Sequence, residues 1–69
     1  MKNLGTRLKA KIKENGHTQH SLALLLGITD SEISRYVSGE RMPSLSVLVS
    51  LANNLNTTTD YLLGREDRV

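Results

Sequence analysis

Residues 18–38 read TQHSLALLLGITDSEISRYVS, and this stretch decides the fold. Thr18 can cap a short helix that ends at Gly27. Thr29 and Glu32, three residues apart, form the capping-box signature of a following helix. Because glycine adopts positive φ without strain, Gly27 suits the tight turn that two crossing helices require. The stretch therefore predicts a pair of short helices joined by a sharp turn.

Apolar residues within this stretch fall where two crossing helices would touch. Leu22 and Ala23 lie on the inner side of the first helix, and the small alanine allows close approach. Ile33 and Val37 are the expected buried pair of the second helix, and Ile28 fills the angle between the two.

The outward positions of the second helix are short polar groups and one long cation: Asp30, Ser31, Ser34, Arg35 and Ser38. In DNA-binding proteins, a helix pair of this kind places its second helix in the major groove of DNA. There the planar fork of Arg35 would match the O6 and N7 acceptors of guanine, although an exposed arginine is by default a solvated one. A carboxylate at Asp30 repels phosphates, so we expect it to favour the helix N-terminus through the helix dipole. Acceptance from a cytosine amino group is its alternative role.

Three further helices are predicted outside this stretch. Residues 3–15 carry Leu4, Leu8 and Ile12 at every fourth position, and a stop at Gly16 follows. After Gly39 and Pro43, Ser44 caps a helix whose apolar positions are Leu45, Leu48, Leu51, Ala52 and Leu55. We expect Thr59 to cap a last helix over residues 60–63, and no strand is predicted. The expected fold class is all-α, with five short helices.

A chain of 69 residues has room for one small core, so we expect a single domain over residues 1–64 and a polar tail over residues 65–69. It contains no cysteine, so helix packing must hold it together. Its longest apolar stretch, residues 22–26, is far shorter than the roughly 20 residues that span a bilayer. No signal-peptide core follows the first residues. The sequence therefore favours a soluble, cytoplasmic protein.

Charge and residue types argue against several other functions. The net charge is +2, and five of the nine basic residues lie in the first thirteen positions, where we expect a solvated cationic face. His17 and His20 have no third ligand for a metal, so capping or surface roles are favoured. The chain offers no cysteine, glycine-rich phosphate loop or enclosed Ser-His-Asp set. We expect no catalysis, cofactor, metal or small-molecule ligand.

The sequence resembles the phage-repressor and Cro-like helix-turn-helix proteins, the XRE-like transcriptional regulators. The resemblance covers most of the chain, and it is carried by Thr18-Gln19, Leu22-Ala23, Leu26-Gly27-Ile28-Thr29, Ile33-Ser34-Arg35-Tyr36, Gly39, Arg41, Pro43-Ser44-Leu45, Leu48, Leu51-Ala52, Leu55 and Asp60-Tyr61-Leu62. Each residue is common, but their joint spacing without an insertion is specific.

The resemblance implies a lambda-repressor-like fold in which residues 30–38 lie in the major groove of DNA. The base-reading residues it implies are Ser31, Ser34 and Arg35, with Asp30 a lesser candidate; the phosphate contacts are Gln19, Thr29, Ser38 and Arg41. From spacing alone, Gln19 is equally well explained as a surface helix former. Tyr36 is expected at the core edge rather than as a base-stacking platform, so binding to single strands is disfavoured.

The resemblance also implies a homodimer on an operator with two-fold related half-sites, with reading helices about 34 Å apart. We expect the dimer to use residues 57–63, where Thr58, Tyr61 and Leu62 supply the surface. The predicted function is a sequence-specific regulator of transcription, a repressor, encoded in a prokaryotic cell or by a phage. One alternative is an antitoxin or restriction-control protein of the same fold. Another is a protein-interaction module without DNA affinity, which Asp30 and Glu32 on the reading helix would suit.

Overall fold

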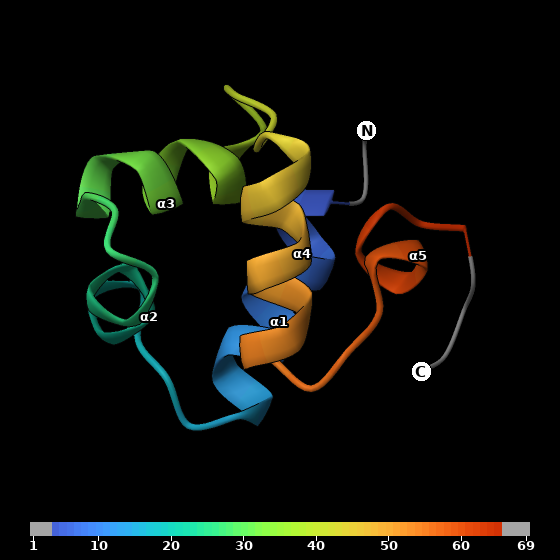
Figure 1. Cartoon of the computed structure of the whole chain (residues 1–69), viewed down its shortest axis with the longest axis horizontal. Coiled ribbons are helices and arrows are strands. Elements are labelled where there is room, and N and C mark those ends of the chain that lie inside the picture. Colours follow the sequence, from blue (N-terminus) through green and yellow to red (C-terminus); the bar gives the residue numbers. More distant parts are fainter. Residues whose placement is uncertain (1–3, 66–69) are drawn as a thin grey trace.

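A computed structural model describes residues 4–65 and contains five helices (Figure 1). They are α1 (Leu4–Glu14), α2 (Gln19–Leu26), α3 (Asp30–Ser38), α4 (Leu45–Asn54) and α5 (Thr59–Leu62). Residues 4–65 include no strand, and the predicted all-α class is confirmed. The predicted polar tail lies, except for Arg65, outside the described residues, as does Asn3 at the predicted start of the first helix.

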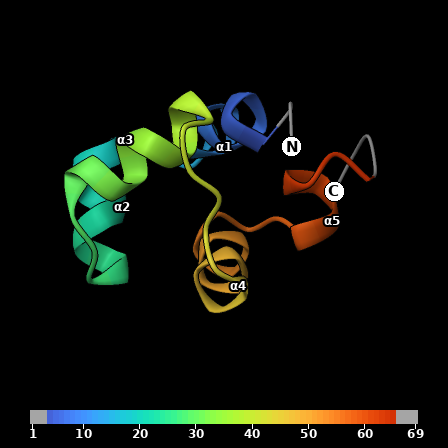
Figure 2. The same ribbon diagram turned by 90° about the horizontal axis from the view of Figure 1, so that it is seen from above.

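Two helices lie on one side of a central pair of helices, and one helix lies on the other side. In Figure 1, α1 and α4 occupy the middle of the molecule, with α2 and α3 to the left and α5 to the right. Seen from above, α1 lies in the upper part of the view and α4 in the lower part (Figure 2). The contacts follow this arrangement, because α3 packs against both α2 and α1, α2 also packs against α4, and α5 packs against α1 and α4. The two helices of the turn motif, α2 and α3, thus pack against α4 and α1, respectively.

One apolar cluster joins all five helices. Its buried members are Leu4, Leu8, Ile12, Leu22, Ala23, Ile33, Tyr36, Leu48, Leu51, Ala52, Leu55 and Leu62. The every-fourth-residue stripe predicted for α1 is confirmed, as are the inward positions of Leu22, Ala23 and Ile33. Within residues 4–65 no charged side chain is buried, so removal of apolar area from water is the main stabilising contribution.

One predicted core position is wrong, and one apolar position of α4 lies outside the core. α3 buries Ile33 and Tyr36, whereas Val37 is only half-buried at the edge of the cluster. The reason is the close crossing of α1, whose Gly5 lies against the main chain of Val37 and leaves the tyrosine to fill the interior. Leu45 is 76% exposed, because as the first residue of α4 it is not covered by another helix.

The last helix begins one residue earlier than predicted. Thr58, not Thr59, is its cap: Thr58 has extended backbone angles and its Oγ1 accepts a hydrogen bond from the Tyr61 amide at 3.0 Å. Residues 57–59 are all threonine, so local sequence offers three equivalent caps. The register that buries Leu62 completely selects among them.

Candidate nucleic-acid interface

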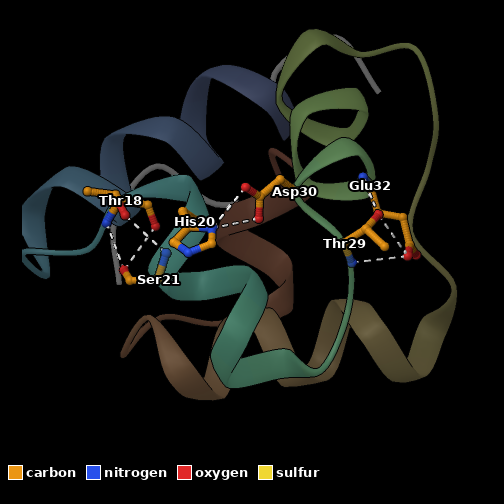
Figure 3. Close-up of polar contacts among 6 residues, drawn as sticks. All are labelled: Thr18, His20, Ser21, Thr29, Asp30 and Glu32. Carbon is orange, nitrogen blue, oxygen red and sulfur yellow. Dashed lines mark hydrogen bonds and ion pairs between the residues drawn. The ribbon is translucent and has the colours of Figure 1, made fainter.

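The first helix of the turn motif is fixed at its start by reciprocal hydrogen bonds (Figure 3). The Ser21 amide donates to Thr18 Oγ1 at 3.0 Å, and the Thr18 amide donates to Ser21 Oγ at 2.9 Å. The predicted cap at Thr18 is confirmed, with Ser21 as its partner. His17 lies beside this cap, its Nδ1 3.2 Å from Ser21 Oγ. This histidine belongs to the helix start, as predicted for a capping or surface residue.

The turn between the helices has the predicted geometry. Gly27 adopts φ 70° and ψ 29°, the left-handed conformation that glycine tolerates. The Ile28 amide then donates to the Ala23 carbonyl at 3.1 Å, which closes the end of α2. The chain is redirected within two residues, so that α3 crosses α2 closely.

The second helix starts with the predicted capping box. The Glu32 amide donates to Thr29 Oγ1 at 3.1 Å, and the Thr29 amide donates to Glu32 Oε1 at 3.2 Å (Figure 3). The Thr29 hydroxyl also donates to Glu32 Oε1 at 3.2 Å. Since a hydroxyl carries one proton, Thr29 has no side-chain donor left for a phosphate in this arrangement. Its predicted phosphate contact therefore competes with the cap.

The predicted reading residues share an exposed face of α3. Ser31, Ser34, Arg35 and Ser38 are all exposed, and their spacing of three and four residues places them on one side of a helix. The Arg35 side chain is 51% exposed, and its Nε lies 3.9 Å from Glu40 Oε2. Such a long, solvated ion pair contributes little and leaves the guanidinium able to take another partner.

The predicted phosphate contacts differ in what their side chains already bind. Ser38 Oγ donates to the Arg35 carbonyl at 3.1 Å and accepts from the Glu40 amide at 3.3 Å, so this hydroxyl helps to end α3. Gln19 is half-buried at the start of α2, and Arg41 is exposed in the loop after α3. Neither of these two side chains hydrogen-bonds to another of the described residues.

An interaction that local sequence did not predict joins the two helices. His20 Nδ1 lies 2.8 Å from Asp30 Oδ2 and 3.0 Å from Oδ1, so the ring of α2 meets the carboxylate at the start of α3 (Figure 3). Both side chains are exposed, at 66% and 62%. The residues are ten positions apart on different helices, so neither helical spacing nor a motif links them. Their chemistry, an imidazole and a carboxylate, was the only signal.

The residues predicted for a dimer surface are not equally available. Leu62 is fully buried in the core of its own chain, so the prediction that it supplies interface area is wrong. Tyr61 is half-buried, with its ring centroid 4.6 Å from the Arg7 guanidinium and 4.9 Å from Lys11 Nζ. Thr58 is exposed. The cations over Tyr61 leave it only a partly open surface.

Two further properties of residues 4–65 bear on function. No three histidine, cysteine, aspartate or glutamate side chains come together as a metal-ion site there. None of the helices in that range has the length and apolar character to cross a membrane.

Known proteins match this chain in sequence. The helix-turn-helix family model matches residues 8–62. Over 64 residues the chain is 39% identical to the HTH-type transcriptional regulator ImmR and 45% identical to the HTH-type transcriptional regulator AnsR, both of Bacillus subtilis strain 168. These matches cover 93% of this chain, but 50% of ImmR and 54% of AnsR. The chain thus spans about half the length of these two relatives.

A shorter relative matches over most of its own length as well. The uncharacterized HTH-type transcriptional regulator YazB of the same organism is 36% identical over 58 residues, which are 84% of each chain. The range that the family model matches, residues 8–62, contains the turn motif and its two capping boxes.

Proposed function

Because the chain belongs to the helix-turn-helix family, we propose that it binds double-stranded DNA and regulates transcription, with α3 in the major groove. One observation carries this proposal: Ser31, Ser34, Arg35 and Ser38 form an exposed polar row on the second helix of the motif. A major groove about 12 Å wide admits an α-helix, and such a row meets the base edges. The relatives named as transcriptional regulators support the same role.

Within this row we assign Arg35 to a guanine, since its fork matches the O6 and N7 acceptors. Ser31 and Ser34 are assigned to neighbouring bases, which a hydroxyl can meet as donor or acceptor. Arg41 and Gln19 are assigned to phosphates, because their side chains are uncommitted among the described residues. Ser38 and Thr29 would lie beside the DNA backbone in this proposed complex. Their hydroxyl protons, however, are already donated in hydrogen bonds at the two ends of α3.

We further propose that the protein acts as a homodimer on two-fold related half-sites in the bacterial cytoplasm. Thr58 and the open edge of Tyr61 are the proposed contacts, and Leu62 supports them from within the core. The half-sites would lie about 34 Å apart. Sedimentation of the protein bound to a two-site duplex tests this assembly: one copy per duplex at saturation would exclude it.

Repression is the proposed outcome, because a protein that fills the major groove over a promoter excludes others from the same base pairs. The alternative of a protein-interaction module rested on Asp30 and Glu32. Both carboxylates have partners within the motif, Asp30 in His20 and Glu32 in Thr29, so each has a structural role in this chain. An antitoxin or restriction-control regulator would use the same interface, and the neighbouring genes would distinguish these settings.

The test is selection of binding sites from random duplexes, followed by binding of two arginine variants. Arg35→Ala is expected to relax preference at one base pair, at a loss of about 1–3 kcal/mol of discrimination. Arg41→Ala is the matched control, since loss of a phosphate contact weakens all sequences alike and lowers the salt slope by roughly 0.9. If the selection enriched no site and the affinity for duplex DNA did not change with salt concentration, the protein-interaction module would be supported instead.

A further inference from the structure

We propose that His20 is a DNA phosphate contact that operates only when its ring is protonated, with Asp30 as the residue that positions it. The proposal rests on the proposed DNA binding and adds a pH-dependent contact that sequence reasoning did not assign. It also gives Asp30 a role other than reading a base.

The geometry of the pair determines which ring atom is available. An ionised carboxylate only accepts hydrogen bonds, so His20 Nδ1 donates to Asp30 at 2.8 Å. This bond fixes the ring, and Nε2 is left on the side of the ring away from Asp30 (Figure 3). The His20 side chain is 66% exposed, so a ligand can reach Nε2 from solvent. A neutral ring that donates through Nδ1 has no proton on Nε2, whereas the imidazolium has one.

The pair lies at the edge of the proposed reading face. Asp30 is the first residue of α3 and directly precedes Ser31, while His20 directly follows Gln19, the proposed phosphate contact. With a neutral ring the pair carries one negative charge, which repels the DNA backbone. With an imidazolium the pair is neutral overall and presents an N–H donor. Protonation therefore replaces a repulsion with a charge-assisted hydrogen bond.

Other ionisable groups around His20 do not offer the same change. α3 contributes Asp30, Glu32, Arg35 and Tyr36. Glu32 is held in the capping box, Arg35 lies near Glu40, and Tyr36 is buried in the core. α4, which also packs against α2, carries no ionisable residue. Histidine is the side chain whose charge normally changes between about pH 5 and 8. His17, beside the Thr18 cap, is the other histidine of the chain and provides an internal control.

The experiment measures affinity for a mixed-sequence duplex between about 50 and 200 mM salt, at about pH 8 and pH 5.5. Phosphate contacts do not depend on sequence, so this probe does not require the operator. For the wild-type protein we expect affinity to rise about tenfold at acidic pH and low salt, the effect of one charge-assisted hydrogen bond. The slope of log affinity against log salt should steepen by roughly 0.9, as for one more neutralised phosphate.

Three variants separate His20 from other causes. His20→Gln should remove the pH dependence of both affinity and salt slope, whereas His17→Gln should keep both. Asp30→Asn removes the repelling charge and the group that orients the ring, so affinity at pH 8 should rise and the ratio between the two pH values should shrink. Circular dichroism at both pH values checks that each variant is folded, which is expected because the substituted groups of His20 and Asp30 are exposed.

Each result has a definite meaning. An equal pH response in wild type and His20→Gln would overturn the assignment of His20 and leave the proposed function standing. If only His17→Gln lost the pH response, the response would belong to His17, and the assignment of His20 would be overturned. Failure of the wild-type protein to bind duplex DNA at either pH would remove this proposal together with the proposed function.

Discussion

Gly5 of α1 lies directly against the main-chain carbonyl of Val37 in α3. A Cβ built on residue 5 would overlap that carbonyl oxygen, which belongs to the backbone and cannot move aside as a flexible side chain would. Alanine favours a helix over glycine by about 1 kcal/mol, so helix propensity alone predicts a gain from Gly5→Ala. The crossing predicts the opposite, a loss of about 1–3 kcal/mol in the free energy of unfolding as the two helices are forced apart.

Urea unfolding of Gly5→Ala measures this loss, and Gly16→Ala is the matched control. Gly16 has φ 72° with open space around its Cα, so its substitution carries only the cost of about 1–2 kcal/mol for a left-handed residue. Gly5→Ala should also shift α1 against α3 and so change the NMR chemical shifts of residues in α3, whereas Gly16→Ala should leave them unchanged. If Gly5→Ala were as stable as the wild-type protein or more stable, α1 and α3 would tolerate a wider separation.

The same contact shows where prediction from sequence ends. The caps at Thr18 and Thr29 and the turn at Gly27 were predictable, since each involves groups within a few residues of one another. Gly5 and Val37 are 32 positions apart, and the sequence contains only the signal of a glycine inside a helical pattern. Without that crossing, the spacing of α3 favoured Val37 over Tyr36 as the buried residue.

The candidate site divides in the same way. The exposed row of Ser31, Ser34 and Arg35 follows from helical periodicity once α3 is capped, and was predicted. The His20–Asp30 bond depends on the angle at which α2 crosses α3, which no local pattern specifies. The burial of Leu62 depends on where α5 packs against α1 and α4. Residues placed by tertiary packing were therefore the ones that sequence reasoning missed.

The capping box at the start of α3 predicts a graded response to substitution. Thr29→Ala removes the oxygen that accepts from the Glu32 amide, and should cost about 1 kcal/mol of stability. Glu32→Gln should change stability little, because glutamine can still accept from the Thr29 amide. Thermal unfolding of both variants measures the difference. An equal loss in the two would mean that the charge of Glu32, rather than its hydrogen bond, stabilises the helix start.

The ring of Tyr61 predicts a second matched pair of variants. Two cations of α1, Arg7 and Lys11, lie within 4.9 Å of its centroid, and Arg7 Nη1 donates to the Tyr61 carbonyl at 3.2 Å. Tyr61→Phe retains the aromatic face and should be nearly neutral. Tyr61→Leu keeps an apolar side chain but loses the cation–π contacts, and should cost about 0.5–1 kcal/mol.

Unfolding by urea at low and at high salt distinguishes these effects. Equal stabilities of the phenylalanine and leucine variants would assign the contribution of Tyr61 to apolar packing alone. A loss in both variants that depends on protein concentration would instead indicate that Tyr61 contributes to a dimer, as the proposed function holds.

Leu45 and Leu48 provide the last test, because they lie one turn apart on α4 and differ in burial. Leu48 is 5% exposed within the cluster, whereas Leu45 is 76% exposed. Leu48→Ala should cost about 2–5 kcal/mol, from lost transfer free energy and the cavity that remains. Leu45→Ala should stay within about 0.5 kcal/mol of wild type, as for other surface substitutions. Since a small domain is stable by roughly 5 kcal/mol, Leu48→Ala should be partly unfolded at 37 °C by circular dichroism. A large loss for Leu45→Ala would mean that this leucine is covered in solution, and its dependence on protein concentration would identify a second copy of the chain as the cover.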